Sequence, residues 1–336
     1  MRKAPYCRGM RLLVVAPCFY PLGQSGYSGI ERLAVLLARE FARAKHKVEV
    51  IGASRSTGIE GCMVWRSSAE GSFVEAEEQA WKEYGWMAKD FDFTIDLSHS
   101  HFFRRHGESG ASWIWHDPKL MTPPVPLTGL YALSQWQATR HLEATHQTIP
   151  VLDCICADPE VYYYDSKVEV SDRWFSLGIL DKNKGQREAA LLAEEAGIKL
   201  DIAGKPVDDD VVREIREIEK RTQGRVRYLG ELKLGEVGKA KLLRQARGML
   251  YWPSYPEGFG EAHSQKLVEA LMLGLPCIVR DQGAMAEVFG DMALVVPEWN
   301  TPFAWISDQI AERAAKSWSA PIVAQRILEV VAGVKA

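Results

Sequence analysis

The stretch RLLVVAPCFYPLGQSGYSGIERLAVLLAREFARAKHKVEVIGA, residues 11–53, decides the fold class. It opens with a continuous apolar run at 11–18, as expected of a strand that is buried on both faces. A glycine-rich loop follows, and then apolar residues recur at helical spacing over 30–44 before a second apolar run at 47–53. A strand, a helix and a strand in this order predict a parallel sheet.

The same pattern recurs on both sides of an irregular, acid-rich segment at 157–172. Before it, we predict further strands at 93–99, 112–116, 130–134 and 150–156, and helices at 68–92 and 136–144. After it, we predict strands at 174–180, 199–204, 225–230, 248–254, 277–281 and 293–298, and helices at 186–196, 209–221, 236–246, 265–273 and 320–332. The chain therefore predicts two parallel α/β domains of similar size, whose ligands bind at the carboxyl ends of the strands.

Composition limits the function classes. The 336 residues are 47% apolar and 25% charged, with a net charge of −3, which disfavours a nucleic-acid partner. No run reaches the roughly 18 apolar residues of a membrane span, and the N-terminal apolar run lacks a signal-peptide cleavage pattern. The six cysteines are scattered through a long chain, so we expect free thiols in a cytoplasmic protein.

Two glycine-containing loops could bind an anion. Gly23, Gly26 and Gly29 are spaced G-x-x-G-x-x-G, which is neither the dinucleotide fingerprint nor a P-loop, so a nicotinamide cofactor is disfavoured. Backbone N–H groups at the helix start near Gly29 can approach an anion, although these glycines could serve only to turn the loop. Lys184 and Gly185 stand at a second strand-to-helix junction. A lysine there suits a diphosphate, and an ordinary exposed loop lysine is the alternative.

Two carboxylates flank a predicted helix in EGFGEAHSQKLVEALMLGLP, residues 257–276. Ser264 can cap a helix that ends before Gly274. Glu261 then lies in the preceding loop and Glu269 in the second turn, so the two acids do not share one helical face. They are suited to different parts of one extended ligand, and a carboxylate can accept hydrogen bonds from both hydroxyls of a sugar diol.

The segment EAHSQKLVEALMLGLPCIV, residues 261–279, resembles the E-x7-E signature of retaining glycosyltransferases of family 4. Glu261 and Glu269 fit the spacing, while Glu257 copies the EGFG letters of the motif and remains the rival first acid. The resemblance covers nearly the whole chain. SGIERLAV resembles the GG-x-E loop, IDLSHSH a strand ending in a histidine pair, SWIWHD the histidine near the donor sugar, LGILDKNKG the G-R-L-x-x-x-K-G loop, and SWSAPIVAQRILEVV the closing helix.

This resemblance implies a GT-B fold, in which two Rossmann-like parallel α/β domains face each other across a cleft. The first domain would span 1–160 on the acceptor side, and the second would span 161–317 and bind the nucleotide sugar. A C-terminal helix at 318–336 would pack back on the first domain.

The resemblance also implies a hexosyltransferase that moves a sugar from a nucleotide-diphosphate sugar to an acceptor hydroxyl with retention, by a front-face mechanism without metal or cofactor. UDP is the first choice of nucleotide and GDP the second; the acceptor would be a sugar, a lipid-linked sugar or a small molecule. The implied catalytic residues are His116 and Glu261, the nucleotide-binding residues Lys184, Leu267 and Glu269, and the donor-sugar and phosphate loop Gly29, His263 and Ser264.

Three departures from the family pattern leave alternatives open. Ile179 stands where the family has arginine, which removes a charged donor worth about 1.5–3 kcal/mol. His263 and Ser264 replace the usual phenylalanine and glycine. A weakly active or inactive nucleotide-sugar-binding protein of the same fold is therefore the alternative function, and a sugar-nucleotide epimerase is a further one.

Two other interpretations concern the first domain. His99, His101 and His116 could be imagined as zinc ligands, but no cysteine or acid stands at ligand spacing, so no metal is expected. The basic stretch at 39–47 could contact an anionic membrane that carries a lipid-linked acceptor, or it could be a solvated helix end.

Overall fold

The computed structural model describes residues 9–23, 29–68, 71–106, 109–118, 128–297 and 307–333. This part of the chain divides into two compact units. One comprises the described residues up to Cys156 together with those from Ser319 onward, and the other comprises those of Ala157–Trp318.

The first unit is built on a six-stranded parallel sheet with the order β3-β2-β1-β4-β5-β6. Its strands are β1 (Arg11–Val15), β2 (Lys47–Ala53), β3 (Cys62–Ser67), β4 (Phe93–Asp96), β5 (Gly110–Trp113) and β6 (Leu130–Tyr131). In the register, Leu12 of the central strand β1 lies opposite Val48 on one side and Phe93 on the other. Strand β1 is buried from Leu12 to Val15, which explains its continuous apolar sequence.

The helices of the first unit are α1 (Gly29–Arg43), α2 (Phe73–Tyr84), the 3-10 turn η1 (Gly85–Asp90), α3 (Phe102–His106), α4 (Gln135–Thr145) and α11 (Ala320–Val331). Leu33, Leu37 and Phe41 recur along α1 at helical spacing and are buried. Helix α11 contacts α1, and its residue Ile327 is 0% exposed. The C-terminal helix therefore completes the core of the first unit.

The second unit repeats this topology, with the strand order β12-β11-β10-β7-β8-β9 and parallel pairing throughout. Its strands are β7 (Arg173–Leu177), β8 (Lys199–Ala203), β9 (Val226–Tyr228), β10 (Gly248–Tyr251), β11 (Cys277–Arg280) and β12 (Leu294–Val296). Its helices are η2 (Lys182–Lys184), α5 (Gln186–Ala196), α6 (Asp209–Arg221), α7 (Glu236–Arg244), α8 (Gln265–Met272), α9 (Met285–Phe289) and α10 (Ser307–Trp318).

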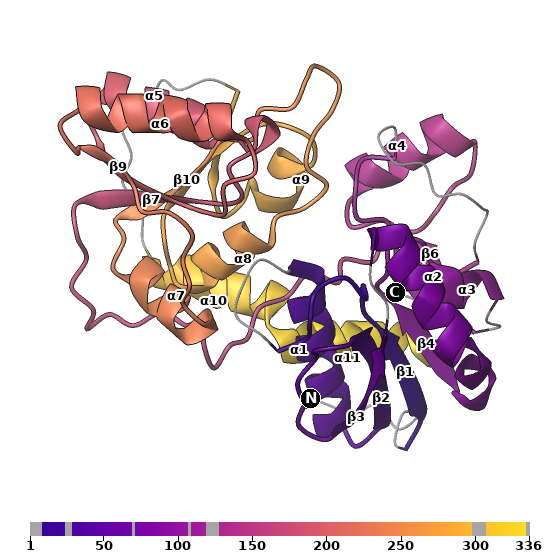
Figure 1. Ribbon diagram of the computed structural model, residues 1–336. Helices are drawn as coiled ribbons and strands as arrows, with labels where there is room; N and C mark the ends of the chain where they lie inside the picture. Colours follow the sequence, from indigo (N-terminus) through magenta and orange to yellow (C-terminus); the bar gives the residue numbers. More distant parts are fainter. Residues whose placement is uncertain are drawn as a thin grey trace. The chain divides into compact units, whose positions relative to one another are not determined.

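Helices α5 and α6 lie side by side on one face of this second sheet (Figure 1). Their apolar residues form one buried cluster with alternate residues of the strands, such as Leu200 and Ile202 of β8. The residue between these two, Asp201, points to the opposite face because side chains alternate along a strand.

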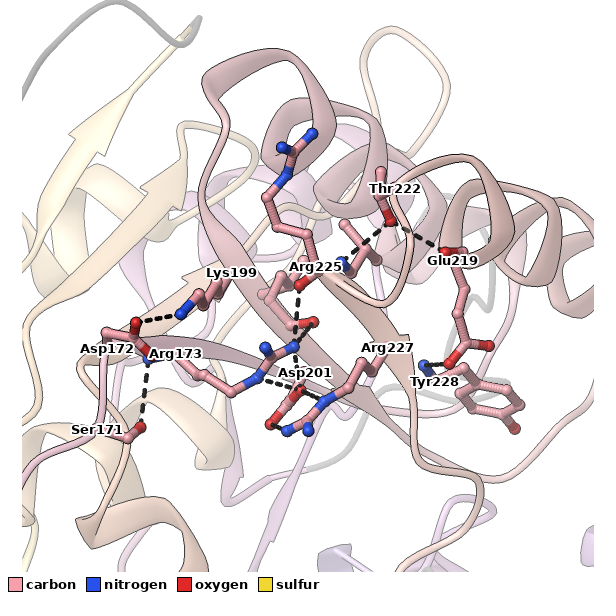
Figure 2. Close-up of polar contacts among 12 residues, drawn as sticks. Ser171, Asp172, Arg173, Lys199, Asp201, Glu219, Thr222, Arg225, Arg227 and Tyr228 are labelled. Carbon is pink, nitrogen blue, oxygen red and sulfur yellow. Dashed lines mark hydrogen bonds and ion pairs between the residues drawn. The ribbon is translucent and has the colours of Figure 1, made fainter.

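Asp201 is held by arginines from both neighbouring strands (Figure 2). Arg173 of β7 donates to its Oδ1 at 2.7 Å, and Arg227 of β9 donates to both carboxylate oxygens at 2.7 and 2.6 Å. Burial alone would raise the pKa of Asp201, but the two guanidinium groups hold it below its usual value. The three strands at this edge are thus joined by ion pairs as well as by backbone hydrogen bonds.

The fold class predicted from the sequence is confirmed by the two six-stranded parallel sheets and by the contact of α11 with α1. The predicted strand at 150–156 is wrong, because Val151 forms only an isolated bridge with Ala132. Strand β3 and helix α10 were not predicted.

No helix of the described part is long and apolar enough to cross a membrane. The free state predicted for the thiols is confirmed for the cysteines described: Cys18, Cys62, Cys154, Cys156 and Cys277.

The contact of α11 with the first unit can be tested by truncating a buried side chain. We expect Ile327→Ala to lower the free energy of unfolding of this unit by about 2–5 kcal/mol, because it leaves a cavity at a fully buried position. Ile322→Ala on the same helix, where the side chain is 39% exposed, should change it by no more than about 0.5 kcal/mol. Urea denaturation of both variants measures the difference, and equal losses would contradict the packing described.

Candidate active site

The site is assembled where the strand order of the second sheet reverses. Strands β7 and β10 are neighbours in the sheet, and the chain leaves them toward opposite edges. Ligands of doubly wound folds bind at such switch points, beyond the carboxyl ends of the strands. The loop after β7 carries Lys184, and the loop after β10 carries Tyr255 and Glu261.

These three side chains meet. Lys184 Nζ donates to Glu261 Oε1 at 2.7 Å and to the Tyr255 hydroxyl at 2.8 Å. The Tyr255 hydroxyl in turn donates to Glu261 Oε1 at 3.0 Å. The side chains of Lys184 and Glu261 retain 22% and 14% of their exposure, so a ligand can still reach them.

The pair keeps both of its members charged. Burial disfavours the protonated form of Lys184, but Glu261 outweighs it and raises the pKa of the lysine well above its ordinary value. Burial likewise works to raise the pKa of Glu261, yet the charge of Lys184 holds it below its usual value. The pKa of Tyr255 is raised by burial and by Glu261, so this hydroxyl remains protonated and able to donate.

Close backbone contacts fix the two loops. Gly185 has a φ of +70°, and a Cβ built there would lie 1.5 Å from the carbonyl oxygen of Trp252. Ser254 N–H donates to the carbonyl of Asn183 at 2.9 Å, which joins the two loops directly. On the other side, Ala284 N–H donates to the carbonyl of Glu261 at 2.8 Å. Lys184 and Glu261 are therefore positioned by backbone as well as by their own ion pair.

Helix α8 follows this acid. The Ser264 hydroxyl accepts from Leu267 N–H at 3.5 Å as an N-cap, and the Ser264 N–H donates to His263 Nδ1 at 2.8 Å. The buried His263 ring packs edge-on against Phe289 and Trp318. The Leu267 side chain is 0% exposed and belongs to the core. Leu267 therefore contributes to the helix start through its backbone and not through its side chain.

Glu269, the second motif acid, is 1% exposed. Its Oε2 lies 3.0 Å from Lys239 Nζ of α7, and that ammonium also lies 3.1 Å from Glu236. The Tyr162 hydroxyl donates to Glu236 at 2.6 Å. A chain of charged and polar groups from two helices and the segment before β7 thus holds the Glu269 carboxylate in place.

The first unit holds the other predicted site residues. Gly29 begins α1, and the buried Glu31 follows in the first turn, where burial raises its pKa to about 7. His116 follows β5 and is exposed, its ring stacks on that of His99 at 5.5 Å between centroids, and its carbonyl accepts from Gln137 Nε2 at 3.0 Å.

A carboxylate–imidazole pair, not predicted from the sequence, supports this stack. Glu77 of α2 accepts from the N–H groups of His99 and Ser100 at 2.8 and 2.7 Å, and it lies 3.1 Å from His99 Nδ1. Burial opposes ionisation of Glu77, but these hydrogen bonds and His99 lower its pKa overall. The carboxylate therefore favours the His99 tautomer with hydrogen on Nδ1 and a lone pair on Nε2.

The structure thus brings Lys184 and Glu261 into contact and places His263, Ser264, Leu267 and Glu269 next along the same segment. Glu257, the rival first acid, is exposed in a turn. Gly29 and His116 belong to the other unit. Across the described ranges, no group of three or more His, Cys, Asp or Glu side chains is placed to hold a metal ion.

Comparison with known proteins identifies the second unit. Residues 178–311, which include Lys184, Glu261 and α8, match the protein-family model described as "Glycosyl transferases group 1". The second unit is a group 1 glycosyltransferase domain. The family and the enzyme class predicted from the sequence are thereby confirmed. No curated protein matches the chain.

Solved structures of glycosyltransferases share the fold of the whole chain. The structure of AviGT4, a glycosyltransferase involved in avilamycin A biosynthesis, matches with a TM-score of 0.76 at 22% identity, covering 96% of this chain and 98% of that one. Anabaena Alr3699/HepE in complex with UDP and glucose matches with a TM-score of 0.65 at 15% identity, covering 96% and 100%. Sucrose-phosphate synthase from Thermosynechococcus elongatus matches with a TM-score of 0.64 at 13% identity, covering 96% of each chain.

The close approach at Gly185 generates a stability prediction. We expect Gly185→Ala to lower the free energy of unfolding by about 3 kcal/mol or more, because it adds a clash with the Trp252 carbonyl to the cost of a positive φ. Gly197→Ala is the matched control: its φ is +69° with nothing within 4 Å of the added Cβ, so only about 1–2 kcal/mol should be lost. Chemical denaturation compares the two, and equal losses would exclude the proposed contact.

The Lys184–Glu261 pair predicts coupling that depends on pH. In a double-mutant cycle of Lys184→Met and Glu261→Gln at pH 7, we expect about 1–3 kcal/mol of coupling. Because the folded-state pKa of Glu261 is lowered, this stabilisation is present above the ordinary value of 4.5 and is lost as the pH falls below it. Unfolding free energies measured at pH 7 and near pH 3 test the sign, and coupling that grows on acidification would refute it.

Proposed function

We propose that this chain transfers a sugar from a nucleotide-diphosphate sugar, with UDP as the first choice and GDP as the second, to an acceptor hydroxyl with retention of configuration. The contact of Lys184 with Glu261 at the strand switch point of a group 1 glycosyltransferase domain carries this proposal. The UDP and UDP-glucose complexes of Anabaena Alr3699/HepE, which shares the fold, support UDP as the first nucleotide to test.

Lys184 suits the leaving diphosphate. When the anomeric C–O bond breaks, negative charge develops on the diphosphate, and a preorganised ammonium stabilises it without having to reorganise. The pKa of Lys184, raised by Glu261 against burial, keeps this group charged through the neutral range. The acceptor oxygen attacks the same face of the sugar and passes its proton to a leaving phosphate oxygen.

The acids suit hydroxyl groups. The carboxylate of Glu261 can exchange part of its contact with Lys184 and Tyr255 for donor-sugar hydroxyls. Glu269, held by Lys239, is assigned to the ribose hydroxyls. The helix start at Ser264 and the neighbouring His263 are assigned to the phosphate and the donor sugar. His116 and Gly29 of the first unit keep the donor-sugar and phosphate roles expected from the sequence.

One observation favours a second function. Ile179, in the loop after β7, supplies no charge where the family pattern expects arginine. A chain that binds a nucleotide sugar without transferring it would fit that loss, and measurements of binding and turnover on the same protein distinguish the two functions.

Binding is tested first, by thermal shift with UDP, GDP and their sugars. A nucleotide at 100 times its dissociation constant should add about 2.7 kcal/mol of apparent stability. Turnover is then followed as release of nucleoside diphosphate from the donor that binds. Binding with turnover supports transfer, binding without turnover favours the second function, and no binding at millimolar concentration overturns both.

The two candidate acids give a matched pair of variants. We expect Glu261→Gln to lower donor turnover by about tenfold to a hundredfold, since it loses charged hydrogen bonds to the sugar. Glu257→Gln, at an exposed turn, should leave turnover unchanged. The reverse order of effects would assign the first motif position to Glu257.

A further inference from the structure

A second lysine lies beside the Lys184 site. Lys266 stands in the first turn of α8 and is partly buried. Its Nζ lies 5.5 Å from the centre of the Tyr251 ring at the end of β10. It also lies against the start of the loop after β7, since a Cβ built on Gly178 would be 2.7 Å from this nitrogen. Lys266 therefore approaches from α8 the same loop that carries Lys184.

In the part of the chain that the structure describes, Lys266 has no contacting carboxylate of its own. Two acids act on Lys266, and each is already in contact with another lysine: Glu261 with Lys184 and Glu269 with Lys239. Among the residues that the structure describes, no carboxylate forms an ion pair with Lys266. The positive end of the helix dipole further disfavours the charged form of Lys266, because a cation in the first turn is unfavourable. Of the lysines Lys184, Lys239 and Lys266, the first two are therefore paired with carboxylates and Lys266 is not.

We propose that Lys266 is the second cation of the donor site and binds the diphosphate of the nucleotide sugar together with Lys184. This inference rests on the proposed function and concerns how the same site holds its ligand. A diphosphate would supply the negative charge that Lys266 lacks, since its oxygens accept charge-assisted hydrogen bonds from ammonium groups. Lys266 would thereby provide from α8 the charge that Ile179 does not provide from the loop.

The ionisation of Lys266 makes the proposal measurable. The groups that act on it are Lys184 on η2, Glu261 after β10, Tyr251 on β10, Glu269 on its own helix and Lys239 on α7. Burial, followed by repulsion from Lys184, lowers the pKa of Lys266 to about 8. Lys184 and Tyr251 have raised pKa values and do not titrate near that pH. Binding of a diphosphate should therefore be accompanied by proton uptake at pH 8.5.

The experiment is calorimetric titration with UDP, and with GDP if UDP does not bind. We expect Lys266→Met to raise the dissociation constant by about tenfold to a hundredfold and to abolish proton uptake at pH 8.5, measured in buffers of different ionisation enthalpy. Lys266→Arg should restore affinity without proton uptake, because arginine stays charged. Lys233→Met removes the same charge from an exposed position and should leave binding unchanged.

The outcomes separate the two proposals. A wild-type protein that binds neither nucleotide overturns the proposed function. A wild-type protein that binds UDP no more tightly than Lys266→Met overturns only the role of Lys266. The melting temperature of Lys266→Met without ligand should equal or exceed that of the wild type, since a poorly neutralised charge is removed. A lower melting temperature, with no rescue of binding by arginine, would assign Lys266 to packing and also overturn its role.

Discussion

The ion pair between Lys184 and Glu261 joins the two loops on which the candidate site depends. One loop leaves β7 toward one edge of the sheet and the other leaves β10 toward the opposite edge. Nothing in the course of the chain would hold them together, so a hydrogen bond from Ser254 to Asn183 and the contact of Lys184 with Glu261 do so. The requirement for glycine at 185 follows, because any side chain there would separate the loops.

Other ion pairs in the second unit also join different helices, strands and loops. Asp201 is held by arginines of both adjacent strands, Glu269 by Lys239 of the preceding helix, and Glu261 by Lys184. Each acid is paired with a base from a different element, so the ion pairs tie elements together. Lys266 differs from these bases, since it lies against the Tyr251 ring and Gly178 and forms no ion pair with a carboxylate of the described residues. A lysine that no carboxylate contacts can attract an anionic ligand, as we propose for Lys266.

The sequence predicted the sheets because buried parallel strands have continuous apolar sequences. Strand β3 escaped this criterion: it lies at the edge, and most of its residues, Met63 among them, are partly or largely exposed. The sequence singled out the motif acids by their spacing and Lys184 by its strand-to-helix junction, and the structure brings Lys184 and Glu261 into contact. Glu77 was not singled out, because it lies in a glutamate-rich helix and its partner His99 is 22 residues away. In the sequence, Lys266 cannot be distinguished from a solvated lysine on a helix surface. Only the fold shows that it lies against Gly178 and Tyr251.

The C-terminal helix has a consequence for biosynthesis. The chain leaves the first unit at Cys156, builds all of the second unit, and returns at Ser319 to place α11 against α1. During translation the N-terminal half therefore emerges first but lacks Val323, Ile327 and Leu328, which are buried in its finished core. The second unit has its entire sequence outside the ribosome earlier. The part of the protein that is made first is thus the last to be completed, and until then α1 exposes the apolar surface that α11 covers.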